Sequence, residues 1–335
     1  PSFQCDNYDR VWEVFGYEIS QHIADFNDNG IINSSLENIY AYPAQGNPHF
    51  ENIHGFELTN TTAGLAPFHD ENNDGIYNPE DGDFPLPENV SEEKIPHHII
   101  WGIFNDGGGL HTQSLGDALN IEVQLTAYSF YCNDDELLNN TIFTSHKVIN
   151  RGNETLDSMI FSKWVDFDLG CHSDDYLGCA PDLNTFYVYN EDPNDGGIDG
   201  SDCLLGGMGF GENPPVQAIT ILNKEMSSFI MSQGFGGTTS PVTAGEYYNF
   251  MQGKWRTGEP MTQGGNGYGG TQSVSFLYPD NPNDPNGWSL FSEMPPSNRR
   301  LSMANIEIDE PLLQNDFTKI DIAYTTYQSL FLNHI

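Results

Sequence analysis

Basic residues are scarce in this 335-residue chain. It has 11 Lys and Arg against 48 Asp and Glu, which gives a formal net charge of -37. A phosphate backbone would be repelled by so acidic a surface, so the composition excludes nucleic acid as a partner. The acidic residues gather with Asn and Gly in short segments, an arrangement typical of carboxylates held for cations.

Long apolar runs are also missing. No stretch approaches the roughly 20 apolar residues that a membrane-spanning helix needs, so the sequence predicts no transmembrane segment. Pro1 does not open a signal peptide and the last residues carry no sorting signal, so we expect the natural protein to be longer.

The common catalytic signatures are absent as well. The chain has no Gly-x-Ser-x-Gly, no phosphate-binding Walker loop and no His-Glu-x-x-His. No motif pairs a nucleophile with a base. These absences favour a protein that is not an enzyme.

Cysteine is sparse and odd in number. The five are Cys5, Cys132, Cys171, Cys179 and Cys203. Cys171 and Cys179 flank a short acidic segment, so we predict a local disulfide between them, as expected in an oxidising compartment. Five free thiols are the alternative.

Aromatic residues are abundant, with 21 Phe and 16 Tyr, and they indicate a folded chain with a real core. Apolar side chains at three- and four-residue spacing predict an amphipathic helix over residues 7–24. From about residue 97, runs rich in β-branched and aromatic residues alternate with Asn-, Asp- and Gly-rich turns. The predicted strands are 98–104, 121–131, 141–149, 158–165, 185–189, 218–222 and 320–326.

This pattern predicts a mainly β protein, an antiparallel β-sandwich or jelly roll with long calcium-stabilised loops and a short N-terminal helix. We expect residues 1–95 to form a helix and calcium-loop region packed on a β domain of residues 96–335. Residues 233–298 hold much of the Gly and Pro and are interpreted as long ordered loops.

Residues 70–81 carry the strongest local motif. Calcium takes six to eight oxygen ligands, and a 12-residue loop supplies them from positions 1, 3, 5, 7 and 12, with Gly at position 6 for the turn. Those ligands are Asp70, Asn72, Asp74, the Ile76 carbonyl and Asp81. Asp83 is the alternative to Asp81, or a group that supports the ligands from behind, and a polar Asn-Gly turn without calcium is the alternative to the site itself. Asp at position 12 resembles dockerin loops, and the Pro and Gly that follow favour a structural staple over a switch.

Residues 25–30 repeat the first half of that motif. Asp25, Asn27 and Asn29 occupy positions 1, 3 and 5, and Gly30 occupies position 6. The twelfth position is Leu36, with Glu37 one residue late. We therefore weigh a second calcium site against a structural turn.

A third acidic group is Asp166 and Asp168, followed by Asp174 and Asp175. Crowded carboxylates repel unless a cation or protons intervene, so calcium is the first interpretation. A paired-carboxylate glycosidase site, with Trp255 or Trp288 as a platform for sugar stacking, is the rival. Against the rival, these acids sit among other acids rather than alone in an apolar pocket. Residues 190–202 and 280–286 are interpreted as solvated acidic turns.

Four motifs follow one another in order along the chain: Gly64-Leu-Ala-Pro-Phe68, Asp74-Gly-Ile-Tyr-Asn-Pro79, Trp164-Val-Asp-Phe-Asp-Leu-Gly170 and Ile320-Asp-Ile-Ala-Tyr324. Together they resemble a pattern in large secreted proteins of Bacteroidetes, which commonly carry a type IX secretion sorting domain. The resemblance implies export across the outer membrane and an extracellular or cell-surface location. Asp157-Ser158-Met159 also matches the O-glycosylation pattern of such exported proteins, with a plain strand position for Ser158 as the alternative.

These observations predict a non-enzymatic, calcium-stabilised structural or adhesive surface protein. Its exposed loops would meet a glycan, a surface or neighbouring copies of itself. A glycan-binding module or glycoside hydrolase is one alternative, and a calcium-bridged subunit of a surface filament or layer is another.

Overall fold

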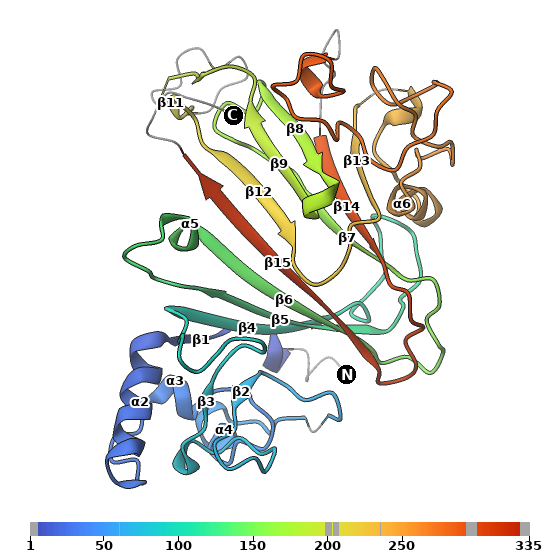
Figure 1. Cartoon of the computed structure of the whole chain (residues 1–335). Helices are drawn as coiled ribbons and strands as arrows, with labels where there is room; N and C mark the ends of the chain where they lie inside the picture. Colours follow the sequence, from blue (N-terminus) through green and yellow to red (C-terminus); the bar gives the residue numbers. More distant parts are fainter. Residues whose placement is uncertain are drawn as a thin grey trace. The chain divides into compact units, whose positions relative to one another are not determined.

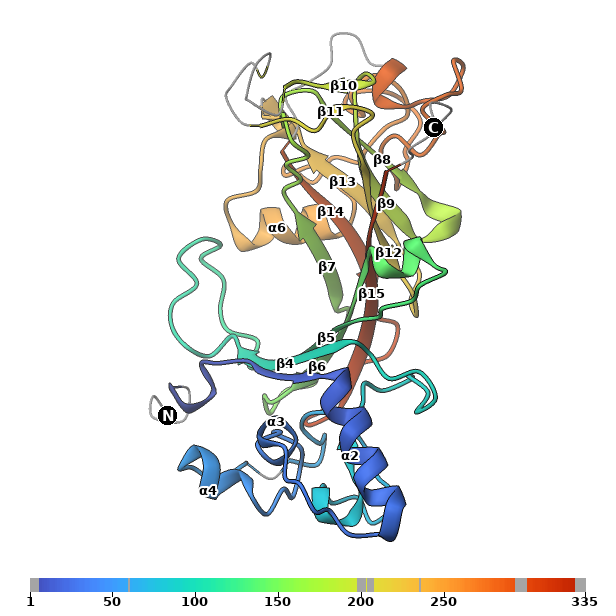
Figure 2. The ribbon, with the colours of Figure 1, turned by 90° about the vertical axis from the view of Figure 1, so that its left-hand side faces the viewer.

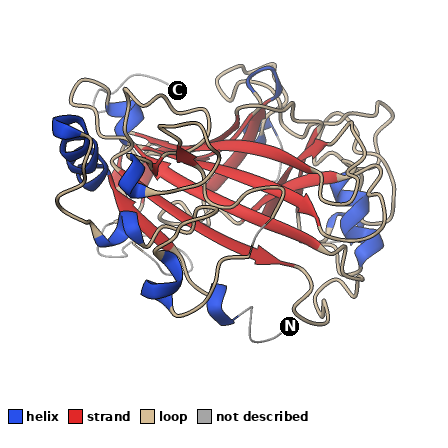
Figure 3. Ribbon diagram, turned by 90° about the horizontal axis from the view of Figure 1, so that it is seen from below, coloured by secondary structure: helices blue, strands red, loops and turns tan. Residues whose placement is uncertain are grey.

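The computed structural model describes residues 6–59, 61–197, 203, 208–234, 236–292 and 300–328. The predicted mainly β class is confirmed, because antiparallel strands make up most of the regular structure and the helices are short (Figure 3). The chain forms two compact units. Unit 1 comprises Pro1–Gly109, Ala118–Leu156 and Leu312–Asp321, and unit 2 comprises Leu110–Asp117, Asp157–Pro311 and Ile322–Ile335.

The sheet of unit 1 has the hydrogen-bonded order β1-β4-β5-β6-β15. These strands are β1 (Trp12–Phe15), β4 (His98–Asn105), β5 (Ile121–Ser129), β6 (Thr141–Asn150) and β15 (Phe317–Tyr327). Residues 322–327 of β15 belong to unit 2, where they pair with β12. The strands of unit 1 are rich in β-branched and aromatic residues, which pack well on a pleated surface.

Short helices and two-residue strands cover one face of that sheet. They are α2 (Gly16–Asn29), α3 (Glu37–Tyr40), α4 (Phe50–His54), β2 (Phe68–His69), η1 (Pro79–Asp81) and β3 (Phe84–Pro85), while α5 (Glu136–Asn139) joins β5 to β6. Figure 2 shows α2, α3 and α4 gathered on one side of β4, β5 and β6. The core between them contains fully buried Ile39, Phe50, Tyr77 and Trp101.

The predicted helix over residues 7–24 is wrong for residues 9–15, although residues 7 and 8 are helical. Trp12–Phe15 is a strand, with Trp12 and Val14 buried and Glu13 exposed between them, and it pairs with β4. Four residues of alternating burial fit a half-buried strand, and pairing with β4 outweighs the helical spacing. The helix starts at Gly16 and continues to Asn29.

The units also differ from the predicted division at residues 95 and 96. Strands β4 to β6 belong with the N-terminal segments. The reason is a shared core, in which Trp12 and Val14 of β1 pack with Ile99 and Trp101 of β4.

Unit 2 contains two sheets that face each other. One continues from β15 through β12 (Val216–Ile221) and β9 (Thr185–Asn190) to β8 (Asp175–Ala180), and the other has the order β13-β14-β7. The latter strands are β13 (Ser228–Ser232), β14 (Arg300–Glu307) and β7 (Ile160–Val165). The buried rings of Phe186 in β9 and Phe229 in β13 lie 5.5 Å apart, so the two sheets form a sandwich (Figure 1).

The remaining elements of unit 2 are short. They are η2 (Pro181–Leu183), β10 (Asn194–Asp195), β11 (Gly211–Glu212), η3 (Gly236–Thr238), α6 (Ala244–Met251) and η4 (Leu290–Ser292). Within the region 233–298, of which the structure describes 233–234 and 236–292, Trp255 is fully buried and its indole N–H donates to the Gly267 carbonyl at 3.0 Å. Among the described residues, no helix is both long and apolar enough to cross a membrane.

Candidate metal sites

The loop at residues 70–83 lies on the surface of unit 1 and is held together by its own acidic side chains. Asp70 accepts the Gly75 N–H on Oδ2 at 2.7 Å and the Asp74 N–H on Oδ1 at 3.2 Å. Gly75 has φ +78°, a conformation that costs glycine little. The carboxylate at the first position therefore faces the backbone of the fifth and sixth positions.

Two further side chains of the predicted ligand set bind the same turn. Asn72 Oδ1 accepts the Asp74 N–H at 2.9 Å, and Asp74 Oδ1 accepts the Ile76 N–H at 2.8 Å. Asn72 also donates to the Asp74 carboxylate at 3.1 Å. The structure thus brings Asp70, Asn72 and Asp74 together around residues 74–76.

Asp83 closes the loop, whereas Asp81 does not. Asp83 is fully buried, and its two oxygens accept the Glu71 N–H at 2.9 Å and the Asn78 N–H at 2.8 Å. Asp81 is exposed and accepts the Asn78 side-chain amide at 2.7 Å. Asp83, predicted as the alternative ligand, therefore joins the two ends of the loop. Asp81, at position 12, does not.

The electrostatics of Asp83 follow from this burial. Loss of contact with water raises the pKa of Asp83, and the nearby carboxylates of Asp70 and Asp74 raise it further against the opposing effect of the two N–H groups. Three negative side chains near one loop favour a cation.

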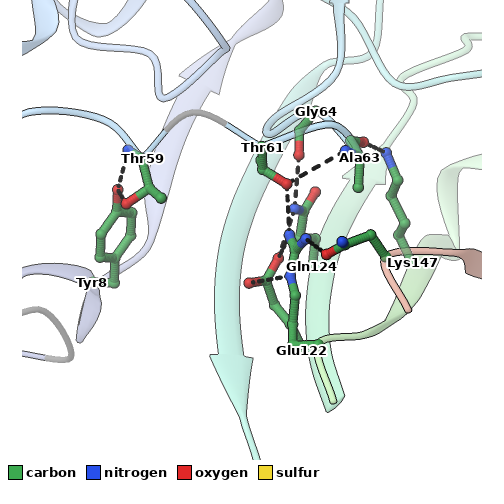
Figure 4. Close-up of polar contacts among 10 residues, drawn as sticks. Tyr8, Thr59, Thr61, Ala63, Gly64, Glu122, Gln124 and Lys147 are labelled. Atoms are coloured by element: carbon green, nitrogen blue, oxygen red, sulfur yellow. Dashed lines mark hydrogen bonds and ion pairs between the residues drawn. The ribbon is translucent and has the colours of Figure 1, made fainter. Parts of the chain in front are cut away.

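Polar contacts fix the segment that leads into this loop (Figure 4). Arg151 donates from Nη2 to the Glu122 carboxylate at 2.8 Å and to the Thr61 hydroxyl at 2.8 Å. Gln124, on the same strand as Glu122, donates from its side-chain amide to the Gly64 carbonyl at 2.9 Å. Residues 61–64 are therefore tied to β5.

The structure does not gather the second predicted ligand set into a loop. Asp25, Asn27 and Asn29 lie in the last turns of α2. Residues two apart on a helix point to different sides, so Asp25 and Asn27 cannot face one point. Asp25 instead accepts the N–H groups of Asn33 at 2.8 Å and Ser34 at 2.9 Å.

The third predicted set is divided by burial. Asp166 and Asp168 are exposed, whereas Asp175 is only 6% exposed and lies at the start of β8. Asp175 accepts the Leu169 N–H on Oδ2 at 2.8 Å. Burial raises the pKa of Asp175 to about 7, and the neighbouring carboxylate of Asp174 contributes to the increase.

Two buried residues beside Asp175 come from a segment interpreted as a solvated turn. That interpretation is wrong for Asn190, which is 6% exposed and pairs with Asp175 across β8 and β9, and for Asp195, which is fully buried. Asp195 accepts the Cys171 N–H at 2.7 Å and the Phe210 N–H at 2.8 Å. The acidic, turn-rich composition of this segment could not reveal that Asn190 and Asp195 are buried, because a solvated turn has the same composition.

The predicted Cys171–Cys179 disulfide is wrong. Cys171 is bonded to Cys203, with a Cα–Cα distance of 5.4 Å, and Cys179 is a buried free thiol. Cys179 lies within β8, four residues after its start, whereas Cys171 lies in the segment before the strand, beside residue 203. The thiol of Cys179 contacts the Leu277 carbonyl instead.

The tryptophans and Ser158 occupy very different environments. Trp255 and Trp288 are 0% and 8% exposed, so neither offers a face for sugar stacking, and that part of the glycosidase hypothesis is wrong. Ser158 is exposed, has φ +53° and precedes β7 rather than lying within it. Its glycosylation stays a prediction.

Among the described residues, no group of three or more His, Cys, Asp or Glu side chains is already arranged as metal ligands. The carboxylates of Asp70, Asp74, Asp83, Asp175 and Asp195 accept backbone N–H groups instead. No protein-family model matches the chain, and no curated protein matches it.

Proposed function

We propose that this chain is a calcium-stabilised structural or adhesive protein of the bacterial cell surface, without enzymatic activity. The observation that carries the proposal is the loop at residues 70–83, where Asp70, Asn72 and Asp74 surround one turn and the buried carboxylate of Asp83 joins its ends. Hard oxygen donors on a glycine turn are what calcium prefers.

The surroundings of the loop favour a structural staple over a calcium switch. A switch of the EF-hand kind needs an exit helix that moves. Here the C-terminal part of the loop consists of η1 and Gly82, and the chain continues into β3 rather than into a helix. Tyr77, within the loop, is fully buried, and its hydroxyl donates to the Ile39 carbonyl at 2.8 Å. Calcium would therefore fix the loop on the core of unit 1.

The extracellular location is supported by two observations of different kinds. The Cys171–Cys203 disulfide is typical of exported proteins, because cytoplasmic thiols are kept reduced. The ordered motifs between Gly64 and Tyr324 resemble those of type IX secretion proteins of Bacteroidetes. Such a protein would meet a glycan, a surface or neighbouring copies through its exposed loops.

A glycoside hydrolase is a poorer fit to the acidic group of unit 2. Asp175 has the raised pKa that a general acid needs, but only 6% of it is exposed. A general acid must reach the oxygen of the bond that it breaks, and Asp175 is covered. Its burial favours a structural role.

Thermal unfolding with and without calcium tests the proposal. Calcium at 100 times its dissociation constant adds about 2.7 kcal/mol to the free energy of unfolding, and a melting temperature rise of roughly 5–10 °C is expected for a unit of this size. The double variant Asp70→Asn, Asp74→Asn should lose at least half of that rise, because two of the charged ligands become neutral.

Asp134→Asn is the matched control, since Asp134 is an exposed carboxylate of the same unit outside the loop. It should show the full calcium effect. A melting temperature of the unchanged protein that responds to neither calcium nor EDTA would contradict the proposal.

A further inference from the structure

A group of oxygen-bearing side chains lies at the β8–β9 end of unit 2. Asp175, Asn190 and Asp195 in this group are buried, and Asp174 is partly buried. We propose that these four residues bind a second calcium ion, at a site distinct from the one in the loop.

Strand pairing places Asp175 and Asn190 together. They are direct partners in the antiparallel pair of β8 and β9, so their side chains project from the same face with Cβ atoms roughly 5 Å apart. Next to this pair, the Glu191 N–H donates to the Asp174 carbonyl at 2.9 Å. Residues 174–175 and 190–191 are therefore locked side by side.

A short backbone segment brings in the third carboxylate. The Leu169 N–H binds Asp175 and the Cys171 N–H binds Asp195, so the two carboxylates contact N–H groups only two residues apart. Between them, Gly170 packs directly on Asp195, because a Cβ at that position would lie 1.9 Å from Oδ2. The disulfide from Cys171 to Cys203 holds the same segment.

An independent observation points to a ligand. The Oδ1 atom of Asn190 is buried and has no hydrogen-bond partner, in a residue that is 94% buried. Its Nδ2 donates to the Asp192 carbonyl at 2.9 Å, which fixes the orientation of the amide. Oδ1 of Asp174 is likewise buried without a partner. A buried oxygen acceptor without a donor is destabilising, and a cation satisfies it.

The chemistry of the donors selects the ion. All four side chains offer oxygen, and each carboxylate oxygen that accepts an N–H keeps a second lone pair for a metal. The nearby sulfur of Cys171 is in a disulfide and is no thiolate ligand. Oxygen donors with three negative charges fit calcium rather than zinc.

Coordination requires small side-chain movements. No three carboxylates of the described residues already converge as metal ligands, so Asp174 and Asp175 must turn about their side-chain torsions. Calcium tolerates irregular coordination with six to eight ligands, and backbone carbonyls and water complete its shell. The strands and the Gly170 contact keep the required movement short.

Counting calcium ions bound per chain tests the site, with calcium alone as the probe. The unchanged protein should bind one ion more than Asn190→Ala, which removes the buried amide oxygen. Asp174→Asn should weaken the same ion at least tenfold, because one charge is lost. Asp182→Asn is the matched control, an exposed carboxylate in η2 of the same unit, and should bind calcium like the unchanged protein.

The loop variant Asp70→Asn, Asp74→Asn separates this site from the proposed function. It should keep the ion of unit 2 and lose that of the loop. The inference would be overturned if Asn190→Ala and Asp174→Asn bound as many calcium ions per chain as the unchanged protein, with the same affinity. That result would leave the loop proposal intact.

Hydrogen exchange of the unchanged protein covers the case in which these variants fail to fold. Calcium should slow exchange in residues 169–176 and 188–197. If saturating calcium left the exchange rates of both segments unchanged, the proposal of a second site would be overturned.

Discussion

Gly82 lies near the end of the loop at residues 70–83, packs against α2 and satisfies two constraints at once. It has φ +96°, and a Cβ there would lie 2.6 Å from the ring of Phe26. Only glycine accepts both the left-handed backbone and the close approach of the aromatic ring. The position of α2 against the loop therefore depends on this residue.

We expect Gly82→Ala to cost about 3 kcal/mol of unfolding free energy, from backbone strain and overpacking together. Gly55→Ala is the matched control, since Gly55 has φ +78° after α4 with no atom within 4 Å of its Cβ position. It should cost only about 1 kcal/mol. Urea unfolding measures both, and equal costs would show that Phe26 does not constrain Gly82.

Asp81 and Asp83 show what motif spacing can and cannot predict at the residue scale. Spacing from Asp70 identifies Asp81 as the twelfth position. The structure buries Asp83 instead, because η1 turns the chain before β3 and leaves Asp81 exposed beside Asn78. The existence of the motif is visible in the sequence, but the direction of each side chain depends on that turn.

At the scale of elements, several strands were predictable from apolar and β-branched runs bounded by turns, although β13 and β14 were not among them. The predicted 98–104, 121–131 and 141–149 correspond to β4, β5 and β6 within two residues at each end. Strand β8 was missed because its run contains Asp175 and Gly178, residues that are depleted in strands. It exists because it pairs with β9 along its full length.

Helix α6 was missed inside a Gly- and Pro-rich region, although its start carries a recognisable signal. Thr243 accepts the Glu246 N–H at 3.4 Å, and Glu246 accepts the Thr243 N–H at 3.2 Å, which together form a capping box. The regional composition concealed this four-residue pattern.

The disulfide links the segment before β8 to residue 203 and so constrains how these parts of the chain are arranged. Replacing both Cys171 and Cys203 with Ala should cost about 3–4 kcal/mol, since the bond closes a 32-residue separation. Thermal unfolding measures this cost, and Cys132→Ala, at a partly exposed free thiol, should change stability little.

Peptide mapping without reduction identifies the pairing directly. It should yield a linked peptide that contains Cys171 and Cys203. A linked peptide that contains Cys171 and Cys179 would restore the pairing expected from sequence and contradict the Cys171–Cys203 bond.

At the scale of the whole molecule, charge is the dominant feature. A net charge of -37 destabilises a compact chain through self-repulsion. Each calcium ion would offset two charges at places where carboxylates are crowded. Composition predicted the need for cations. It could not show where the ions bind, because burial of Asp83, Asp175 and Asp195 arises only from packing and strand pairing.

Anomalous scattering from a crystal grown with calcium tests the central claim most directly. We expect a calcium peak in the loop at residues 70–83, within about 2.3–2.6 Å of oxygens from Asp70, Asn72, Asp74 and the Ile76 carbonyl. One of the two later carboxylates, Asp81 or Asp83, should complete the protein ligands. A loop without anomalous density at millimolar calcium would contradict the account of this chain as a calcium-stabilised protein.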